Sequence, residues 1–248
     1  MVQDNLLCCS VVVVCKDNLS EVKKTIISLL KDGEVPACAE VLVIDDSSED
    51  GISRYIGSLE LENLRYLRGD GVSLYSAMNV GIENSTGTYL WFLNSGDCKS
   101  EEFEITDLHS EMADIVYGDT DYVEHGVIVR KQTRPGFKLL TTQQLNNFLP
   151  CHQSIFFRRK LIVDNNLRYN TDLKISADYK FLEAIVEAGA TVLYRPTTIS
   201  EFALGGISNK YNSFSQVILH ARELKQTRRL SLPQFLILAM KLCRKLRF

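Results

Sequence analysis

The stretch Thr88-Tyr89-Leu90-Trp91-Phe92-Leu93-Asn94-Ser95-Gly96-Asp97 decides how the rest of the chain is interpreted. Its first half is a short, uninterrupted, aromatic apolar run, which is typical of a strand buried on both faces of a sheet. Its second half changes to polar residues and glycine, which turn the chain at the carboxyl end of that strand. In open α/β sheets, ligands bind at this end. Asp97 is therefore placed where a carboxylate could hold a metal ion against a phosphate.

Strands and helices are expected to alternate on both sides of this stretch. A strand, a helix and a second strand with a short return predict a right-handed parallel unit. The helix after Gly71 should turn Leu74, Ala77, Met78 and Ile82 to the core, because these residues share one face. One helix is expected after each of the first two strands, and a third begins near residue 73. A fourth helix should cover about residues 177–188. The expected strands lie at 9–15, 40–44, 63–67, 88–93 and 113–119, with a hairpin partner at 127–130 and a further strand after His152-Gln153.

Length and composition favour one large globular domain. The chain has 248 residues, of which 45% are apolar and 24% charged, as in ordinary soluble proteins. Its seven cysteines are odd in number and show no Cys-x-x-Cys spacing, so we expect reduced, mostly buried thiols in a cytoplasmic protein. We expect no signal peptide, because the N-terminus is acidic and polar before its first strand, and no membrane span, since no run approaches about 18 apolar residues.

The charge of the chain is unevenly distributed. The net charge is −3, but residues 222–248 hold eight Lys or Arg and one acid, Glu223. This segment therefore carries +7, which leaves −10 for residues 1–221. From Phe235 onward a helix would have an apolar stripe opposite Lys241, Arg244 and Lys245, which predicts a tail that lies on an anionic membrane surface. The alternative is a helix that packs on the body or on a dimer partner.

The acidic loop Asp45-Asp46-Ser47-Ser48-Glu49-Asp50-Gly51 follows the second expected strand. It can be a solvated turn that leads into a helix near Ile52. It does not fit a calcium loop, because the twelfth position from Asp46 is Gly57 and not Glu. A dinucleotide-binding fold is also disfavoured, since Lys16-Asp17-Asn18 after the first strand lacks glycine.

Two segments, Ala77–Ile82 and Thr86–Asp97, resemble the centre of the family 2 glycosyltransferases. The resemblance is closest to a bacterial subgroup from colanic-acid and exopolysaccharide clusters, and it extends from about Val11 to Ser208. It implies the GT-A fold, a Rossmann-like α/β fold with a mixed, mainly parallel central sheet flanked by helices. It also implies a nucleotide-binding part at about 1–100, an acceptor part at about 101–221, and a C-terminal helical tail at 222–248.

The resemblance also implies the residues of the nucleotide site. The acidic loop is similar to the family segment in which one Asp accepts the imide N–H of uracil. We favour Asp46 for this role and keep Asp45 as the alternative, because a carboxylate can accept the N–H of a pyrimidine edge. The other expected nucleotide-binding residues are Asp70, Asn79, Asn94 and Ser95, although Asn79 can equally bond to nearby backbone.

A metal ion is implied by the same resemblance. The usual metal motif of the family has two or three aspartates, whereas here Asn94 and Gly96 leave only Asp97. With His152 as a second candidate ligand, the predicted cofactor is Mn²⁺ or Mg²⁺, which keep several waters. The alternatives are a turn or helix-cap role for Asp97 and a structural role for His152.

Asp178 is the expected catalytic base. Ile175-Ser176-Ala177-Asp178-Tyr179 is similar to the family segment that supplies this base. Asp178 should lie in the first turn of a helix, where an Asp is also common for its interaction with the helix dipole and where its pKa should stay low. Gly205, Gly206 and Ser208 form a Gly-Gly-x-Ser loop that can present backbone N–H groups to phosphate or acceptor.

The predicted function is metal-assisted, inverting transfer of a sugar from a nucleotide-sugar, most often a UDP-sugar, to a lipid-diphosphate-linked saccharide. The expected product is a bacterial exopolysaccharide, capsule or O-antigen, made at the inner face of the cytoplasmic membrane. No nucleic-acid partner is expected, and homo-oligomerisation stays open. One alternative is a sugar-1-phosphate nucleotidylyltransferase, although Cys15-Lys16-Asp17-Asn18 is not a Gly-rich phosphate loop. The other is a catalytically silent sugar-nucleotide-binding protein, which the thinned metal motif permits.

Overall fold

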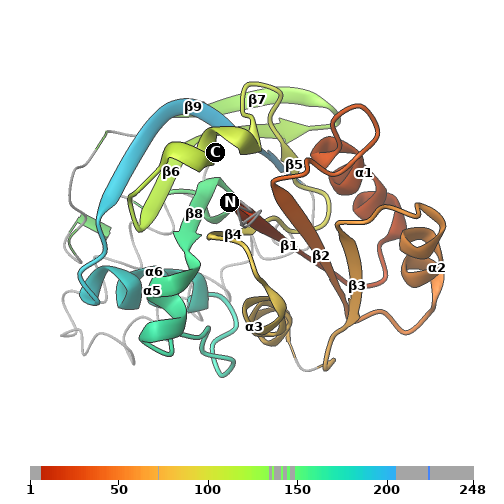
Figure 1. Cartoon of the computed structure of the whole chain (residues 1–248), viewed down its shortest axis with the longest axis horizontal. Helices are drawn as coiled ribbons and strands as arrows, with labels where there is room; N and C mark the ends of the chain where they lie inside the picture. Colours follow the sequence, from red (N-terminus) through yellow and green to blue (C-terminus); the bar gives the residue numbers. More distant parts are fainter. Residues whose placement is uncertain are drawn as a thin grey trace, which may run out of the picture.

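The computed structural model describes residues 7–71, 73–133, 136, 141, 144–145, 149–204 and 223 (Figure 1). Its strands are β1 (Cys9–Cys15), β2 (Ala39–Asp45), β3 (Leu64–Arg68), β4 (Tyr89–Phe92), β5 (Cys98–Lys99), β6 (Ile115–Glu124), β7 (Val127–Gln132), β8 (Ile155–Arg158) and β9 (Val192–Ala203). Its helices are α1 (Leu19–Leu29), α2 (Gly51–Ser58), α3 (Leu74–Asn84), α5 (Arg159–Asp164) and α6 (Ala177–Glu187), with short 3₁₀ turns η1 (Ile105–Ser110) and η2 (His152–Ser154).

One half of the sheet is parallel, as the alternating pattern predicts. Its strands lie in the order β3-β2-β1-β4, and all three neighbouring pairs are parallel. At the centre, Val11 of β1 is paired with Val41 of β2 on one side and Trp91 of β4 on the other. All residues of β1, β2 and β4 are buried, which explains why these strands contain long β-branched and aromatic runs.

The other half of the sheet is mixed. β8 is antiparallel to β4 and to β6, β9 is parallel to β6, and β5 is antiparallel to β9. β7 pairs with β6 as the predicted hairpin partner. The strand continues beyond its predicted end at residue 119, so Asp119 and Asp121 both lie inside β6. Since one sheet continues from β3 to β5, the predicted nucleotide and acceptor parts share a single sheet.

Two hydrophobic cores lie on opposite faces of this sheet. Successive side chains of a strand point to opposite faces, so Val12 and Val14 of β1 join one core while Val11 and Val13 join the other. The first core is covered by α3, α5 and α6, and the second by α1, α2 and η1 (Figure 1). The helix residues of the first core include Met78, Ile82, Ile162, Phe181 and Leu182, and those of the second include Ile26, Ile56, Ile105 and Leu108.

Helix α3 packs closely on β1. A Cβ atom at Gly81 would lie 2.3 Å from the Val12 side chain, so the absence of a side chain lets the helix approach. Ala77, Met78 and Ile82 are buried as predicted, but the prediction for Leu74 is wrong, because its side chain is 47% exposed. The first turn of α3 buries Tyr75 instead, and the hydroxyl of Ser73 caps the helix by accepting the Ser76 N–H at 3.1 Å.

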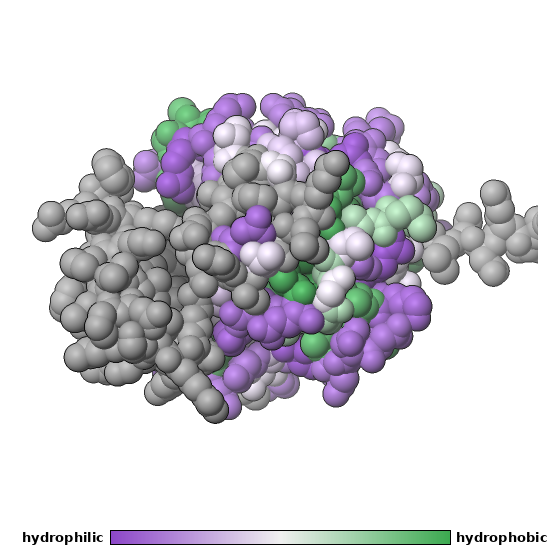
Figure 2. All heavy atoms as spheres, turned by 90° about the vertical axis from the view of Figure 1, so that its left-hand side faces the viewer, coloured by the Kyte–Doolittle hydropathy of each residue, from purple (hydrophilic) through white to green (hydrophobic). Residues whose placement is uncertain are grey.

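The surface and the cysteines agree with the composition. Figure 2 shows that polar side chains make up most of the described surface on that face, with small groups of apolar residues between them. In the part of the chain that the structure describes, the cysteines at 8, 9, 15, 38, 98 and 151 are free thiols, as predicted. None of the described helices has the length and apolar character needed to cross a bilayer.

Candidate active site

The candidate site lies where the parallel strands end. Because β1, β2 and β4 are parallel neighbours, the residues that follow them meet at one edge of the sheet. Asn18 follows β1, Asp46 follows β2, and Asn94 and Ser95 follow β4. The Asn18 side-chain amide donates to the Ser95 hydroxyl at 2.6 Å and joins two of these loops directly.

Asp45 and Asp46 have different environments in the acidic loop. Asp45 is fully buried at the end of β2, where one carboxylate oxygen accepts the Ser47 N–H at 2.8 Å and the other accepts the Tyr66 hydroxyl at 3.2 Å. Asp45 therefore has a structural role. Asp46 is half-buried, and its Oδ1 accepts the Gly71 N–H at 2.9 Å. Of the two, Asp46 is the carboxylate that a ligand can reach.

The loop after β3 is fixed against Asp46. A Cβ atom at Gly69 would lie 1.9 Å from Asp46 Oδ1, so a side chain at this position would displace the Asp46 carboxylate. Asp70 is exposed beside this contact, and its Oδ2 accepts a hydrogen bond from the Ser76 hydroxyl at the start of α3. The structure thus brings the two predicted nucleotide-binding residues, Asp46 and Asp70, into neighbouring loops.

Asn79 does not belong to this group. Its Oδ1 accepts the Tyr169 N–H at 2.8 Å, and its Nδ2 donates to the Tyr169 carbonyl at 3.0 Å. Because both ends of the amide are used by one backbone residue, we assign Asn79 a structural role in place of the predicted nucleotide contact. It holds the segment that precedes α6 against α3.

The turn after β4 contains buried acceptors without partners. The side-chain oxygens of Asn94 and Asn18 are buried and have no hydrogen-bond partner among the described residues. A buried polar atom of this kind usually has a partner, and an unmade bond costs about 1–3 kcal/mol. These two oxygens at the carboxyl edge of the sheet can therefore accept a hydrogen bond from a water molecule or from a bound ligand.

Asp97, the predicted metal ligand, is buried and hydrogen-bonded within the protein. Its side chain is 5% exposed, its Oδ1 accepts the Ala203 N–H at 2.9 Å, and the Gln153 side chain donates to the same carboxyl group. Burial raises the pKa of Asp97 to about 7, although these hydrogen bonds lower it. The carboxyl group therefore ties the β4 turn to the end of β9.

His152 is likewise part of the interior. Its ring stacks on Phe92 with centroids 5.5 Å apart, and its Nε2 lies 3.2 Å from the Tyr169 hydroxyl. Burial lowers the pKa of His152 to about 4, so the imidazole is neutral at pH 7. Among the described residues, neither His152 nor Asp97 belongs to a group of three converging His, Cys, Asp or Glu ligands.

Asp178 lies in the first turn of α6, as predicted, and is half-buried. Burial raises its pKa to about 6, and the nearby charge of Glu223 raises it as well, while the backbone N–H of Tyr179 lowers it. The predicted low pKa is therefore wrong, because desolvation outweighs the helix start. A base with a pKa just below neutral pH is mostly ionised and can still hold a proton in a transition state.

Aromatic rings form the floor around Asp178. Tyr75 and Tyr169 stack with centroids 5.8 Å apart, and Tyr169 stacks on Phe181 at 4.0 Å. The pKa values of both tyrosines are raised, first by burial and then by the Asp178 charge. These two rings had not been singled out in the sequence, where Tyr75 resembled an ordinary helix residue.

Glu223 is a third residue that sequence reasoning missed as part of the site. It is buried, and its carboxylate accepts the N–H groups of Lys174 at 2.8 Å, Ile175 at 3.2 Å and Ser176 at 3.0 Å. It therefore supports the N-terminal end of α6 beside Asp178. The only signal in the sequence was that Glu223 is the single acid of the basic segment 222–248. Gly205, Gly206 and Ser208, and the tail 222–248 apart from Glu223, lie outside the described residues.

Known proteins share this sequence pattern and fold. A family model described as Glycosyl transferase family 2 matches residues 10–165, which is more than half of the chain. Relatives described as PGL/p-HBAD biosynthesis glycosyltransferases, from Mycobacterium bovis and Mycobacterium tuberculosis, are 29% identical over 184 residues, which is 68% of this chain and 68% of theirs.

Solved structures agree on the fold. A UDP complex of residues 1–349 of S. aureus TarS superposes with a TM-score of 0.64 and 17% identity over 88% of this chain and 65% of that chain. GalNAc-T7 with UDP, GalNAc and Mn²⁺ gives a TM-score of 0.63 and 16% identity over 90% of this chain and 48% of that chain. This chain thus spans less than two thirds of the length of either. The chain belongs to glycosyl transferase family 2 and is a glycosyltransferase with the GT-A fold.

Proposed function

We propose that this chain transfers a sugar from a UDP-sugar to a saccharide hydroxyl with inversion at the anomeric carbon, and that Asp178 is the catalytic base. The observation that carries the proposal is the placement of Asp178, with its pKa raised to about 6, in the first turn of α6 beside Tyr75 and Tyr169. The acceptor oxygen attacks the anomeric carbon opposite the departing UDP, and its proton passes to the Asp178 carboxylate. General-base catalysis of this kind contributes typically about 10²–10⁴-fold in rate.

The proposed donor site uses the loops after β1, β2 and β4. Asp46, the reachable carboxylate of the acidic loop, would accept the imide N–H of uracil. The unpartnered oxygens of Asn18 and Asn94 would accept hydroxyl groups of the ribose or of the transferred sugar. The choice of a UDP-sugar is supported by the complexes of TarS with UDP and UDP-GlcNAc, which are neighbours in fold.

The predicted Mn²⁺ or Mg²⁺ fits this chain poorly. Waters and donor phosphates can supply most ligands of such an ion, but at least one protein carboxylate must reach it. Here the Asp97 carboxyl group is buried and hydrogen-bonded, and His152 is packed in an aromatic cluster. The Asn94 oxygen is free but neutral. We therefore propose that the donor is bound mainly by protein hydrogen bonds, although the GalNAc-T7 structure contains Mn²⁺.

The acceptor and the location in the cell are proposed from the sequence. The basic segment 222–248 would hold the enzyme on an anionic membrane, at the inner face of the cytoplasmic membrane, where a lipid-diphosphate-linked saccharide is accessible. The membership of the colanic-acid and exopolysaccharide subgroup, and with it a role in exopolysaccharide, capsule or O-antigen synthesis, is part of this proposal. The alternative is that the tail packs on the body of the protein or on a dimer partner.

A donor screen tests the proposed function. Radiolabelled UDP-, GDP- and dTDP-sugars are incubated with the full chain and short saccharide acceptors, with Mn²⁺ and with a chelator. We expect saturable binding and transfer with at least one UDP-sugar, and an NMR spectrum of the product should show the inverted anomer. Binding without transfer or hydrolysis for any donor would favour the catalytically silent protein, and retention of configuration would contradict the direct displacement.

A further inference from the structure

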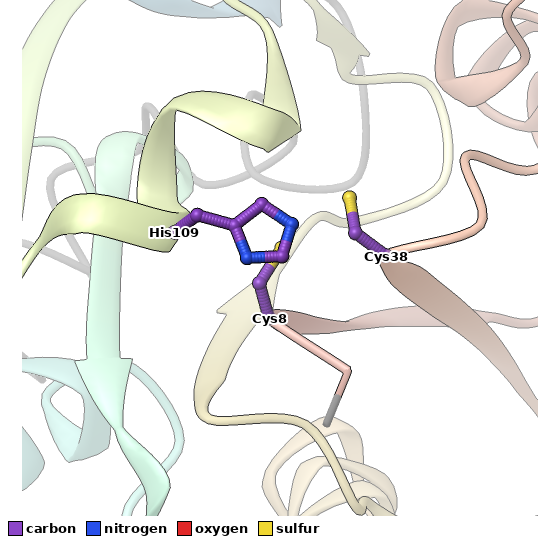
Figure 3. A group of neighbouring side chains, drawn as sticks. All are labelled: Cys8, Cys38 and His109. Atoms are coloured by element: carbon purple, nitrogen blue, oxygen red, sulfur yellow. The ribbon is translucent and has the colours of Figure 1, made fainter. Parts of the chain in front are cut away.

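A cluster of three metal-ligating side chains lies far from the active site. Cys8 directly precedes β1, Cys38 directly precedes β2, and His109 belongs to η1 (Figure 3). Asp46 and Asn94 follow the carboxyl ends of strands in the same parallel sheet, whereas this cluster lies at the amino ends. Seven residues of β1 separate the two ends, which corresponds to about 20 Å. The cluster is therefore separate from the sugar-transfer chemistry.

The backbone holds the two cysteines together. The Cys8 N–H donates to the Cys38 carbonyl at 2.7 Å, and the Cys8 thiol lies 3.6 Å from the Ile105 carbonyl at the start of η1. The two sulfur atoms and an imidazole nitrogen of His109 all lie within 4.8 Å of one another. Figure 3 shows the three side chains converging from three separate segments of the chain.

The donor set indicates which ion would fit. Two thiolates and one imidazole are soft and borderline ligands, which suit Zn²⁺ and do not suit Mg²⁺ or Mn²⁺. Zn²⁺ takes four ligands in a tetrahedron, with Zn–S near 2.3 Å and Zn–N near 2.0–2.1 Å, so neighbouring ligand atoms lie about 3.5–3.8 Å apart. The separations between the ligand atoms need to shrink by no more than about 1.3 Å, and the exposed His109 and half-buried Cys38 can move.

We propose that Cys8, Cys38 and His109 bind one Zn²⁺ ion, with a water molecule or a further ligand in the fourth position. Cys8 is buried and His109 is exposed, so the ion would lie at the surface with one side open to solvent. The ion would join η1 to the amino ends of β1 and β2. Its role would be structural, because it would fix segments that are otherwise joined by hydrogen bonds and apolar contacts.

Cobalt is the probe for this site. The full chain, kept reduced with a phosphine under nitrogen, is stripped of metal and titrated with Co²⁺. We expect a thiolate-to-cobalt charge-transfer absorption that saturates at one equivalent and disappears when one equivalent of Zn²⁺ is added. The absence of this absorption in folded, reduced protein would overturn the proposal.

Variants then locate the bound ion. His109→Ala changes an exposed side chain, so the variant should fold. It should weaken Zn²⁺ binding at least about 10-fold, because removing even a residue that only hydrogen-bonds to a metal ligand typically costs this much affinity. His109→Cys should restore tight binding and add a third thiolate contribution to the cobalt spectrum. Cys98→Ser is the matched control, because Cys98 is a free thiol outside the cluster, and it should leave binding unchanged.

Two results would contradict the assignment. Equal affinity in His109→Ala and the natural chain would show that the ion is bound elsewhere. Loss of two titratable thiols through a Cys8–Cys38 disulfide, formed in air in the presence of excess Zn²⁺, would show that the pair is a redox couple that the ion does not occupy. Protection of both thiols from alkylation by stoichiometric Zn²⁺ would support the site.

Discussion

Asp97 should make the protein less stable as the pH rises, and Asp97→Asn should remove this effect. The ordinary pKa of an aspartate is 3.8, and burial raises that of Asp97 to about 7 in the folded state. Below pH 3.8 the group is protonated in both states and contributes nothing. Between pH 4 and 7 the folded state binds more protons than the unfolded state, so the free energy of unfolding falls as the pH rises.

The size of the effect follows from the pKa difference. A raised pKa of about 7 against 3.8 is about 3 units, and each unit corresponds to 1.36 kcal/mol, which gives about 4 kcal/mol above pH 7. Asparagine has nearly the same shape and can still accept the Ala203 N–H through its oxygen. It does not ionise, so Asp97→Asn should be equal to the natural chain near pH 4 and more stable near pH 8.

Urea unfolding of both proteins between pH 4 and pH 8 measures this difference. Asp178 also has a raised pKa, but it is present in both proteins and its contribution cancels. Met112→Ala, a change at an exposed residue that does not titrate, is the control and should give a difference that does not depend on pH. If Asp97→Asn is less stable at pH 8 than the natural chain, the ionised carboxylate is stabilised in the folded protein, and the burial argument is wrong.

Three further changes test the surroundings of the site. Glu223→Gln should move the acid limb of the kcat/KM profile to lower pH, because the Glu223 charge raises the Asp178 pKa; the exposed change Glu187→Gln should leave the profile in place. Asn79→Ala should lower the free energy of unfolding by about 1–3 kcal/mol, since it leaves the Tyr169 backbone unpaired, while UDP affinity by calorimetry stays the same. Deletion of residues 232–248 should abolish salt-sensitive binding to anionic liposomes, and unchanged binding by the folded, truncated protein would reject the membrane role of the tail.

The sequence predicts the parallel half of the sheet well. β1 was predicted with its bounds, and β2 and β4 within one residue, because fully buried strands need uninterrupted apolar runs. β3, which is only partly buried, was predicted within one residue from its short run Asn63-Leu64-Arg65-Tyr66-Leu67. β9 was missed because Arg195-Pro196 interrupts its pattern. The structure places residues 195–197 where the pairing register between β6 and β9 shifts, which is where a strand tolerates proline.

The roles of single site residues were harder to predict, because their partners are distant in the chain. Asp97 is bonded to Ala203, and Asn79 to Tyr169, separations of 106 and 90 residues. A local pattern gives the residue type and its place at a strand end, but not the group that meets it there. For Asp178 the location was predicted, whereas its pKa depends on burial and on Glu223, neither of which is visible in the segment 175–179.

The most direct test of the central claim is Asp178→Asn. This variant keeps the size of the side chain and the first turn of α6 but removes the basic oxygen. We expect UDP-sugar affinity by calorimetry to stay the same while transfer to a competent acceptor falls about 10²–10⁴-fold. Transfer within a few-fold of the natural chain would place the base elsewhere, and a parallel loss of donor affinity would assign Asp178 to the donor site.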